Sequence, residues 1–371
     1  MGLTALQNHA EGLGAASVAE YRGATTAARF GDPQAEFGAL RSRCGVYDLG
    51  FRTKISLTGD DRVRWLNGMV TNNIRDLSTD QGVYSFLLNP QGHILGDLYA
   101  YNRGDSITVD MDCSQAEKIL ATFDHYIIMD DVEVTNLSDR LTALGVAGPR
   151  CRAVLQAAGL NFPELQPLQL HILECDCDCG CPTCMIVRSD DASNESYEVW
   201  MAPAHVRPVW DALLKAGAVP VGSEALEMQR IVSGIPRNGV DIRERDLPQE
   251  TEQARALNFN KGCYVGQEIV ERIRSRGAVH RKFTGFLSDA RGIAPGVKVV
   301  SGGKDVGEVT SAASIQVGDR TKTLALGYIR REIGVPGREV LIGEAKAMVV
   351  QLPLAESHLL REENSLEQRQ A

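Results

Sequence analysis

Apolar and polar positions alternate in short runs along most of the chain, and turn residues separate these runs. Strands are predicted at 83–88 and 94–101, and the Asn89-Pro90-Gln91-Gly92 sequence between them is a strong turn signal. Helical spacing of apolar residues instead predicts helices at 63–70, 114–126 and 204–216. Residues 1–45 lack a firm period, so we expect a loop-rich entry with one short helix near 33–43. Strands that alternate with helices, with hairpins between several strands, predict an α+β fold with antiparallel sheets.

The pattern changes after Arg281, where short β-rich runs are separated by glycine and proline turns. Runs of this kind at 283–287, 297–300, 308–310, 324–329 and 347–352 predict a small antiparallel β-barrel. The predicted organisation is therefore a first region at 1–280, a barrel at 281–354 and a charged tail at 355–371.

Composition and charge limit the classes of partner. The 371 residues carry a net charge of -9, with 43% hydrophobic and 23% charged residues, as in ordinary globular proteins. This acidic balance argues against nucleic acid and anionic membranes as partners. The apolar runs are too short to span a bilayer. The N-terminus shows no secretory signal or transit peptide, so we expect a cytoplasmic protein, or a mitochondrial-matrix one if the source is eukaryotic.

Five of the nine cysteines lie in one segment, which we interpret as an insertion at about 174–184. They are Cys175, Cys177, Cys179, Cys181 and Cys184. Closely spaced thiolates suit zinc, copper(I) or an iron–sulfur cluster, so one hypothesis is a metal-handling protein that works through this loop. The alternative is a variable, reduced loop, because the spacing matches standard zinc pairs only in part.

A second segment with candidate chemistry is the octet Lys261-Gly262-Cys263-Tyr264-Val265-Gly266-Gln267-Glu268. Apolar residues recur at helical spacing from Val265 onward, so we expect Cys263 just before, or at, a helix N-terminus. The helix dipole and the nearby Lys261 ammonium would favour a reactive thiolate. Gly262 and Gly266 would allow a tight turn. The alternative is a glycine turn with a small, buried cysteine.

The octet resembles the YgfZ family of folate-dependent iron–sulfur assembly factors, whose hallmark is Lys-Gly-Cys-aromatic-x-Gly-Gln-Glu. The chain meets this hallmark in full, at Lys261, Gly262, Cys263, Tyr264, Gly266, Gln267 and Glu268. Residues 15–350 also resemble the related glycine-cleavage T-protein (aminomethyltransferase) superfamily, for example at Val70-Thr71-Asn72-Asn73. This resemblance implies two intertwined α+β subdomains that bind folate and a C-terminal antiparallel β-barrel.

Two departures from the T-protein pattern affect the functional prediction. T-proteins carry Asp-Asp-Leu where this chain has Gly96-Asp97-Leu98, so one acid of two remains. The position of the pterin-facing glutamate holds Asn194, unless Glu195 substitutes through a shift. Asparagine offers two donors and an acceptor to a pterin edge, but no charge. Both departures weigh against aminomethyl transfer and leave folate binding as the expectation.

The resemblance implies tetrahydrofolate or a one-carbon derivative as the cofactor. Its predicted binding residues are Tyr84, Asp97, Asp110, Asn194 and Arg230. Asp97 would handle a proton or orient the folate, Tyr84 would form a stacking wall, and Arg230 would meet the folate glutamate tail. The structural alternatives are a solvated Asp97, a core Tyr84 and an Arg230 on a helix surface.

Three functions compete at this point. The first is a tetrahydrofolate-binding accessory protein that transiently meets iron–sulfur enzymes or assembly proteins and supports their assembly or repair, with Cys263 as its key residue. The second is a folate-dependent aminomethyl or one-carbon transferase, and the third is the metal-handling protein. The complete octet, together with the altered acidic pair, favours the accessory protein. In that function we do not expect the chain itself to be an enzyme.

Overall fold

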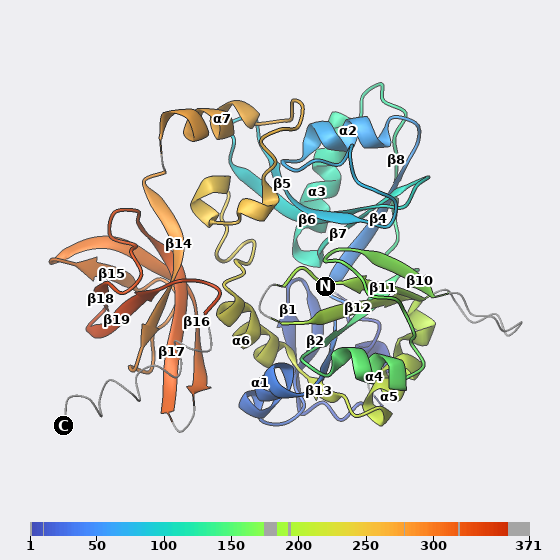
Figure 1. Cartoon of the computed structure of the whole chain (residues 1–371), viewed down its shortest axis with the longest axis horizontal. Helices are drawn as coiled ribbons and strands as arrows, with labels where there is room; N and C mark the ends of the chain where they lie inside the picture. The colour runs from blue at the N-terminus through green and yellow to red at the C-terminus, as the bar shows by residue number, and fades with distance from the viewer. Residues whose placement is uncertain are drawn as a thin grey trace, which may run out of the picture. The chain divides into compact units, whose positions relative to one another are not determined.

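The computed structural model describes residues 2–9, 11–173, 184–191, 194–277, 279–317 and 320–354. The chain divides into two units. The first unit comprises Met1–Leu226 and Gln253–Glu271, and the second comprises Glu227–Glu252 and the described residues from Arg272 onward. Antiparallel sheets and a C-terminal barrel are both present, which confirms the predicted fold class (Figure 1). In the described part of the chain, no helix has the length and apolar character needed to cross a membrane.

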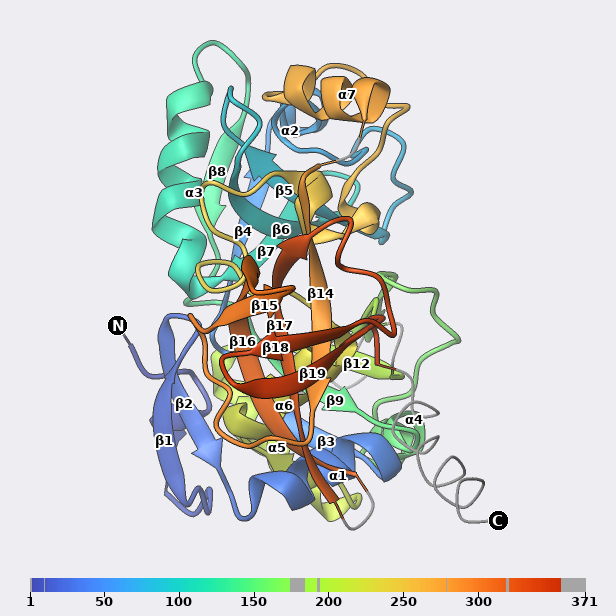
Figure 2. The same cartoon turned by 90° about the vertical axis from the view of Figure 1, so that its left-hand side faces the viewer.

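The first unit contains a five-stranded antiparallel sheet in the order β5-β6-β7-β4-β8. Its strands are β4 (Arg52–Thr58), β5 (Gly82–Leu88), β6 (Ile94–Asn102), β7 (Ile107–Asp112) and β8 (Glu133–Asn136). One face buries Ile55, Leu98 and Val109 in a core with α2 (Arg62–Met69) and α3 (Cys113–Tyr126). Figure 2 shows α3 lying along this sheet. Because strand side chains alternate between faces, the opposite face is left for other residues.

The first unit also contains a six-stranded sheet in the order β10-β11-β12-β9-β3-β13, in which only β13 and β3 pair in parallel among the described strands. Its strands are β3 (Gly45–Asp48), β9 (Thr142–Ala147), β10 (Leu170–Leu173), β11 (Cys184–Arg188), β12 (Ser196–Met201) and β13 (Val219–Val221). The helices α1 (Pro33–Ser42), α4 (Cys151–Ala157) and α5 (Val206–Lys215) belong to the same unit. Trp210 of α5 packs into the core of this sheet with Val146 and Val199.

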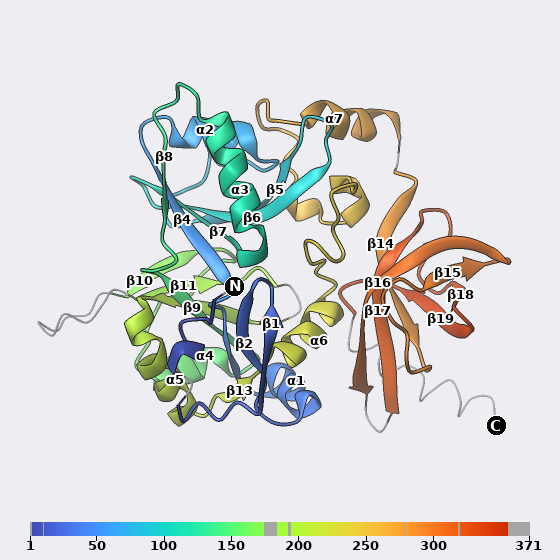
Figure 3. The same cartoon turned by 180° about the vertical axis from the view of Figure 1, so that it is seen from behind.

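The predicted loop-rich entry is wrong for residues 17–29. Here β1 (Ser17–Tyr21) and β2 (Ala24–Arg29) pair as an antiparallel ribbon (Figure 3). Three consecutive residues of β1 are exposed, and β2 consists mostly of alanine and threonine. Neither strand therefore shows the apolar alternation on which the prediction depended. The short helix predicted near 33–43 is α1, which Asp32 caps and Pro33 opens.

The second unit holds the closed barrel, in the order β14-β17-β16-β15-β18-β19. Its strands are β14 (Arg281–Ser288), β15 (Lys298–Ser301), β16 (Lys304–Val317), β17 (Arg320–Arg330), β18 (Glu339–Ile342) and β19 (Ala345–Val350). The barrel closes because β14 pairs with both β17 and β19. Phe286, Val309 and Val349 are fully buried in its core. The remaining described elements include α6 (Ser223–Ser233), the short helices Pro248–Thr251 and Ala254–Ala256, and α7 (Gln267–Arg276).

Candidate functional site

A row of buried or partly buried polar side chains crosses the five-stranded sheet of the first unit. Tyr84 of β5 pairs with Tyr99 of β6, and Tyr99 pairs with Asp110 of β7. Asp110 in turn pairs with Lys54 of β4. Residues paired across antiparallel strands project from the same face. These four side chains therefore share the face opposite the apolar one that packs on α2 and α3.

Charged groups within this row are paired with one another. Lys54 Nζ lies 3.2 Å from Asp110 Oδ1, and both side chains are completely buried. Arg52 Nη2 lies 2.8 Å from Asp110 Oδ2, and its Nη1 lies 3.3 Å from Asp112. Burial opposes the charge of Arg52, but these carboxylates hold its pKa above the usual range. The Lys54 ammonium also lies 4.7 Å from the ring centre of Trp200 in β12, so the row faces the six-stranded sheet.

One carboxylate oxygen of Asp97 accepts a hydrogen bond, and the other has no partner in the described residues. The Tyr84 hydroxyl donates to Asp97 Oδ2 at 2.9 Å, and the Asp97 backbone N–H donates to Gln115 Oε1 at 2.9 Å. Asp97 Oδ1 is buried and has no hydrogen-bond partner among the described residues. Burial, and then the charge of Asp112, raises the pKa of Asp97. Such a carboxyl can hold a proton or give it to a bound molecule.

Arg255 also belongs to this face, although the sequence did not predict it. Its guanidinium carbon lies 4.3 Å from the ring centre of Tyr84. It also forms an ion pair with Asp190, which accepts a hydrogen bond from the Tyr99 hydroxyl at 3.2 Å. Arg255 Nη2 is buried without a partner in the described part of the chain. Arg255 and Asp190 are 65 positions apart, so no spacing rule could link them.

The other predicted folate-binding residues have protein partners. Asn194 Nδ2 donates to the carbonyl oxygen of Leu40, in the last turn of α1, at 2.6 Å. Arg230 belongs to the second unit, where it is buried and donates to Asp241 Oδ2 at 2.6 Å and Ser311 Oγ at 2.8 Å. The structure thus brings together Tyr84 and Asp97. Folate binding by Asn194 and Arg230 stays a prediction.

Lys261 anchors the octet to the end of α2. Its Nζ donates to the carbonyl oxygens of Asn67, Val70 and Asn72, at 2.5, 2.6 and 2.8 Å. Burial lowers the pKa of Lys261 to about 7. The three carbonyl oxygens favour the charged form, since only the ammonium can donate to all of them at once. This residue therefore completes the hydrogen bonding where the helix ends.

Replacing Lys261 by methionine is expected to lower the free energy of unfolding of the first unit by about 2–3 kcal/mol, because it removes a charged donor from three carbonyl groups. All three tryptophans of the chain lie in this unit, so tryptophan fluorescence during urea unfolding measures the change. The matched control is Lys215→Met, at an exposed lysine of the same unit. Equal stability of the two variants would contradict the anchoring role.

Cys263 is exposed, which excludes the alternative of a small, buried cysteine. The first helical residue is Gln267, so Cys263 lies before α7 and not at its N-terminus. The dipole argument for a thiolate is therefore lost, because that effect falls off within the first turn. By contrast, burial raises the pKa of the Cys44 and Cys151 thiols to about 11 and about 12. Among these three thiols, Cys263 is the accessible one.

Gly266 fixes the path of the chain after Cys263. Its φ is 81°, and a Cβ atom there would lie 2.5 Å from the carbonyl oxygen of Asn89. Only glycine fits this close approach, since other residues would both clash and be strained. Tyr264 N–H donates to Gln267 Oε1 at 3.2 Å within the same turn. The octet thus packs its glycine against the β5–β6 turn.

The predicted metal ligands Cys175, Cys177, Cys179 and Cys181 lie outside the described residues. Cys184 is the first residue of β11 and is partly buried. The described residues contain no group of three or more histidine, cysteine, aspartate or glutamate side chains placed to hold a metal ion. Metal binding by the loop stays a prediction.

Comparison with known proteins places the chain in a family. The family model described as "GCVT N-terminal domain" matches residues 8–261. The chain belongs to the T-protein superfamily. An aminomethyltransferase of Rubrobacter xylanophilus is 30% identical over 94% of this chain and 93% of its own length. A putative chloroplastic transferase of Arabidopsis thaliana is 29% identical over 84% of the chain and 72% of its own length.

A solved structure of the same superfamily supports the fold. The crystal structure of glycine cleavage system aminomethyltransferase T from Bartonella henselae matches with a TM-score of 0.85 and 24% identity. The match covers 96% of this chain and 98% of the other. The five-stranded sheet, the six-stranded sheet and the C-terminal barrel therefore form the T-protein fold, as the sequence resemblance predicted.

Proposed function

We propose that this protein binds a reduced folate on the polar face of the first unit and performs folate-dependent one-carbon transfer of the aminomethyltransferase kind. One observation carries the proposal. Beside Tyr84, the acceptor Asp97 Oδ1 and the donor Arg255 Nη2 are both buried without partners in the described residues. Buried polar atoms are normally satisfied, so the pair fits a ligand that has both donors and acceptors. The relatives named aminomethyltransferase support the same class of reaction.

The residues of this face fit a pterin. A pterin edge presents both donors and acceptors, which suits Asp97 and Arg255. Tetrahydrofolate, when bound, supplies the nitrogen atoms that carry a one-carbon unit. Tyr84 orients the Asp97 carboxyl through its hydroxyl. Burial raises the pKa of Asp97, so its free Oδ1 can accept a proton from a substrate nitrogen and return it.

A specific observation favours a second candidate. The complete octet that resembles the YgfZ family contains an exposed Cys263, and Lys261 holds it on α2. An accessible thiol on an anchored turn suits transient contact with another protein. In this second function, the folate-binding protein supports assembly or repair of iron–sulfur enzymes and does not itself transfer aminomethyl groups.

Tetrahydrofolate titration and an aminomethyl-transfer assay on the purified chain test the proposal. We expect saturable binding of tetrahydrofolate and formation of methylenetetrahydrofolate from an aminomethyl donor. Absence of tetrahydrofolate binding would contradict both candidates. Binding without turnover would contradict the first candidate alone.

The second candidate has its own measurement. A strain deficient in iron–sulfur maturation would regain iron–sulfur enzyme activity with the wild-type chain and fail to regain it with Cys263→Ala. The Cys151→Ala variant, at a buried thiol outside the octet, is the control. Full rescue by Cys263→Ala would show that this thiol is not needed for the function.

A further inference from the structure

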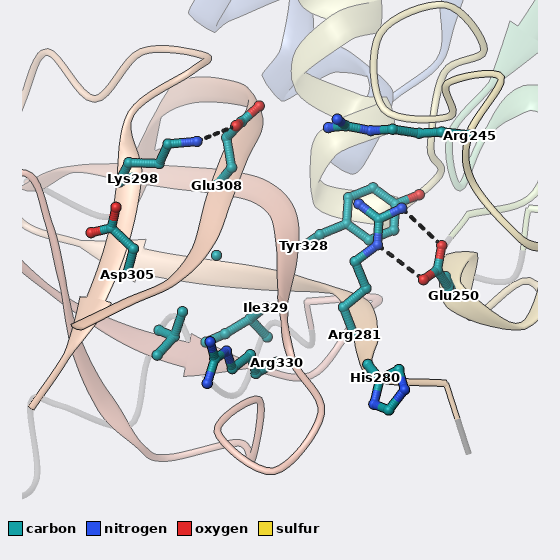
Figure 4. A pocket seen from close by; sticks show the side chains of 12 residues that line it. Arg245, Glu250, His280, Arg281, Lys298, Asp305, Glu308, Tyr328, Ile329 and Arg330 are labelled. Atoms are coloured by element: carbon teal, nitrogen blue, oxygen red, sulfur yellow. Dashed lines mark hydrogen bonds and ion pairs between the residues drawn. The ribbon is translucent and has the colours of Figure 1, made fainter. Parts of the chain in front are cut away.

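The second unit contains a cavity that the proposed folate chemistry does not use. Its volume is about 440 Å³, within the range of small-molecule sites. The walls come from the segment before the barrel, at Arg245 and Glu250, and from strands β14, β15, β16 and β17 (Figure 4). All the residues that line it belong to the second unit. The cavity can therefore be considered within that unit alone.

Tyr328 provides an unused hydrogen-bonding group in this cavity. Its side chain is 6% exposed, and its hydroxyl is buried without a partner among the described residues. The Arg281 guanidinium carbon lies 4.8 Å from the ring centre, so the ring is held in place independently of the hydroxyl. A buried hydroxyl without a partner is costly unless a bound molecule supplies one. Tyr328 thus indicates a ligand.

Most of the other charges in the cavity are internally paired. Arg281 donates to both oxygens of Glu250 at 2.9 Å and to Asp246 Oδ1 at 2.6 Å. Lys298 Nζ lies 2.6 Å from Glu308 Oε2 on another wall. Figure 4 shows both pairs. These charges are engaged within the protein, because Arg281 binds two carboxylates and Glu308 pairs with Arg243, at 3.0 Å, as well as with Lys298. They therefore shape the walls and leave recognition to the remaining groups.

Unpaired donors outnumber unpaired acceptors in what remains. Arg245 and Arg330 line the cavity with exposed side chains, and neither has a side-chain partner in the described part of the chain. Asp305 is the lining carboxylate that also has no side-chain partner in the described residues. Figure 4 shows Arg245 and Tyr328 among the side chains that line the cavity. Two guanidinium groups and a free hydroxyl, against one carboxylate, favour a ligand that carries an oxyanion.

We propose that this cavity is a second ligand site, which binds a small organic molecule with a phosphate or carboxylate group through the Tyr328 hydroxyl and Arg245. The oxyanion accepts hydrogen bonds from both donors. The rest of the molecule occupies the space between the Lys298–Glu308 and Arg281–Glu250 pairs. This site is independent of folate binding by the first unit.

Isothermal titration calorimetry on the full chain tests the proposal with three probes: inorganic phosphate, adenosine 5′-monophosphate and succinate. We expect saturable binding of at least one probe, and the pattern distinguishes a phosphate ligand from a carboxylate ligand. Tyr328→Phe and Arg245→Gln should each weaken that binding by about tenfold, the effect of one lost charge-assisted hydrogen bond. Arg291→Gln, at an exposed arginine outside the cavity, should leave it unchanged.

Tyr328→Phe is also the control for folding. It removes only a hydroxyl that bonds to nothing in the described residues, so the thermal midpoint should stay at or above that of the wild type. Tetrahydrofolate affinity should be the same in all variants, which separates this site from the folate site. Absence of binding of every probe below about 10 mM, or unchanged binding in both Tyr328→Phe and Arg245→Gln, would overturn the proposal.

Discussion

The Asp97→Asn variant is expected to lose folate-dependent transfer activity by about 10²–10⁴-fold while keeping its fold. Asparagine has the same shape and can still accept the hydrogen bond from the Tyr84 hydroxyl. It cannot hold a proton on Oδ1, which is the step that the proposed function assigns to Asp97. Single-turnover rates with a saturating one-carbon donor measure the loss. The matched control is Asp105→Asn, at an exposed aspartate of the same unit, which should retain full activity.

The same substitution has a predictable effect on stability. Burial raises the pKa of Asp97, so the folded protein binds the proton more tightly than the unfolded chain does. Stability therefore falls as pH rises from the ordinary aspartate value, near 3.9, through the raised pKa of the folded state. Above that window the wild type carries the cost of a buried charge, and Asp97→Asn does not. Urea unfolding should show the variant to be more stable than the wild type at pH 8 and equal to it once Asp97 is protonated in both states.

Two results would contradict this account of Asp97. Retention of the wild-type transfer rate by Asp97→Asn would show that the carboxyl takes no part in the transfer reaction. Lower stability of the variant at pH 8 would show that the ionised carboxylate stabilises the fold. The expected combination, a more stable and less active variant, is typical of a residue selected for function at a cost in stability.

The sequence predicted the parts of the fold that depend on local patterns. The Asn89–Gly92 turn sets the β5–β6 hairpin, and regular apolar spacing marks α3 and α5. The short runs after Arg281 form the barrel. The β1–β2 ribbon escaped prediction because Val18 and its neighbours are exposed and leave no alternating pattern. Patterns of this kind appear only where one face is buried.

The candidate site was predicted only in part, because its chemistry depends on contacts between distant residues. Asp97 and Tyr84 follow from the resemblance, but the unpartnered Asp97 Oδ1 is visible only in three dimensions. Arg255 lies in the short helix Ala254–Ala256, and an arginine in such a segment is normally assigned to the solvent. Lys261 belongs to the recognised octet, yet its three carbonyl partners follow from how the octet packs on α2.

Lys54 and Asp110 show most clearly that contacts between distant residues do not follow from one sequence. A lysine within a strand is normally assigned to the solvent-facing side, since lysines are almost never fully buried unless paired. The two residues meet because β4 and β7 are neighbours in the sheet and pair in the register that places Lys54 opposite Asp110. Strand order and register are set by the whole sheet, so a single sequence does not reveal the ion pair.

The Asp110→Asn variant is expected to lower the free energy of unfolding of the first unit by about 3–5 kcal/mol, because it leaves buried positive charge without its partner. Lys54 has no other ion pair in the described residues, and its side chain is completely buried. Arg52 keeps Asp112 at 3.3 Å and is less affected. Tryptophan fluorescence during urea unfolding reports on this unit. The control, Asp76→Asn, breaks an exposed pair with Arg75 and should cost at most about 1 kcal/mol.

A double variant separates the missing charge from the missing contact. If uncompensated charge causes the loss, removing the ammonium as well, in Lys54→Met with Asp110→Asn, should recover part of the stability of the single Asp110→Asn variant. A loss of less than 1 kcal/mol in Asp110→Asn, or a double variant no more stable than the single one, would contradict the buried-pair argument.

Tetrahydrofolate titration of Asp110→Asn, under conditions where it is folded, then isolates the predicted folate contact. Unchanged affinity would assign Asp110 to holding the polar face together, and reduced affinity would place it at the ligand as well.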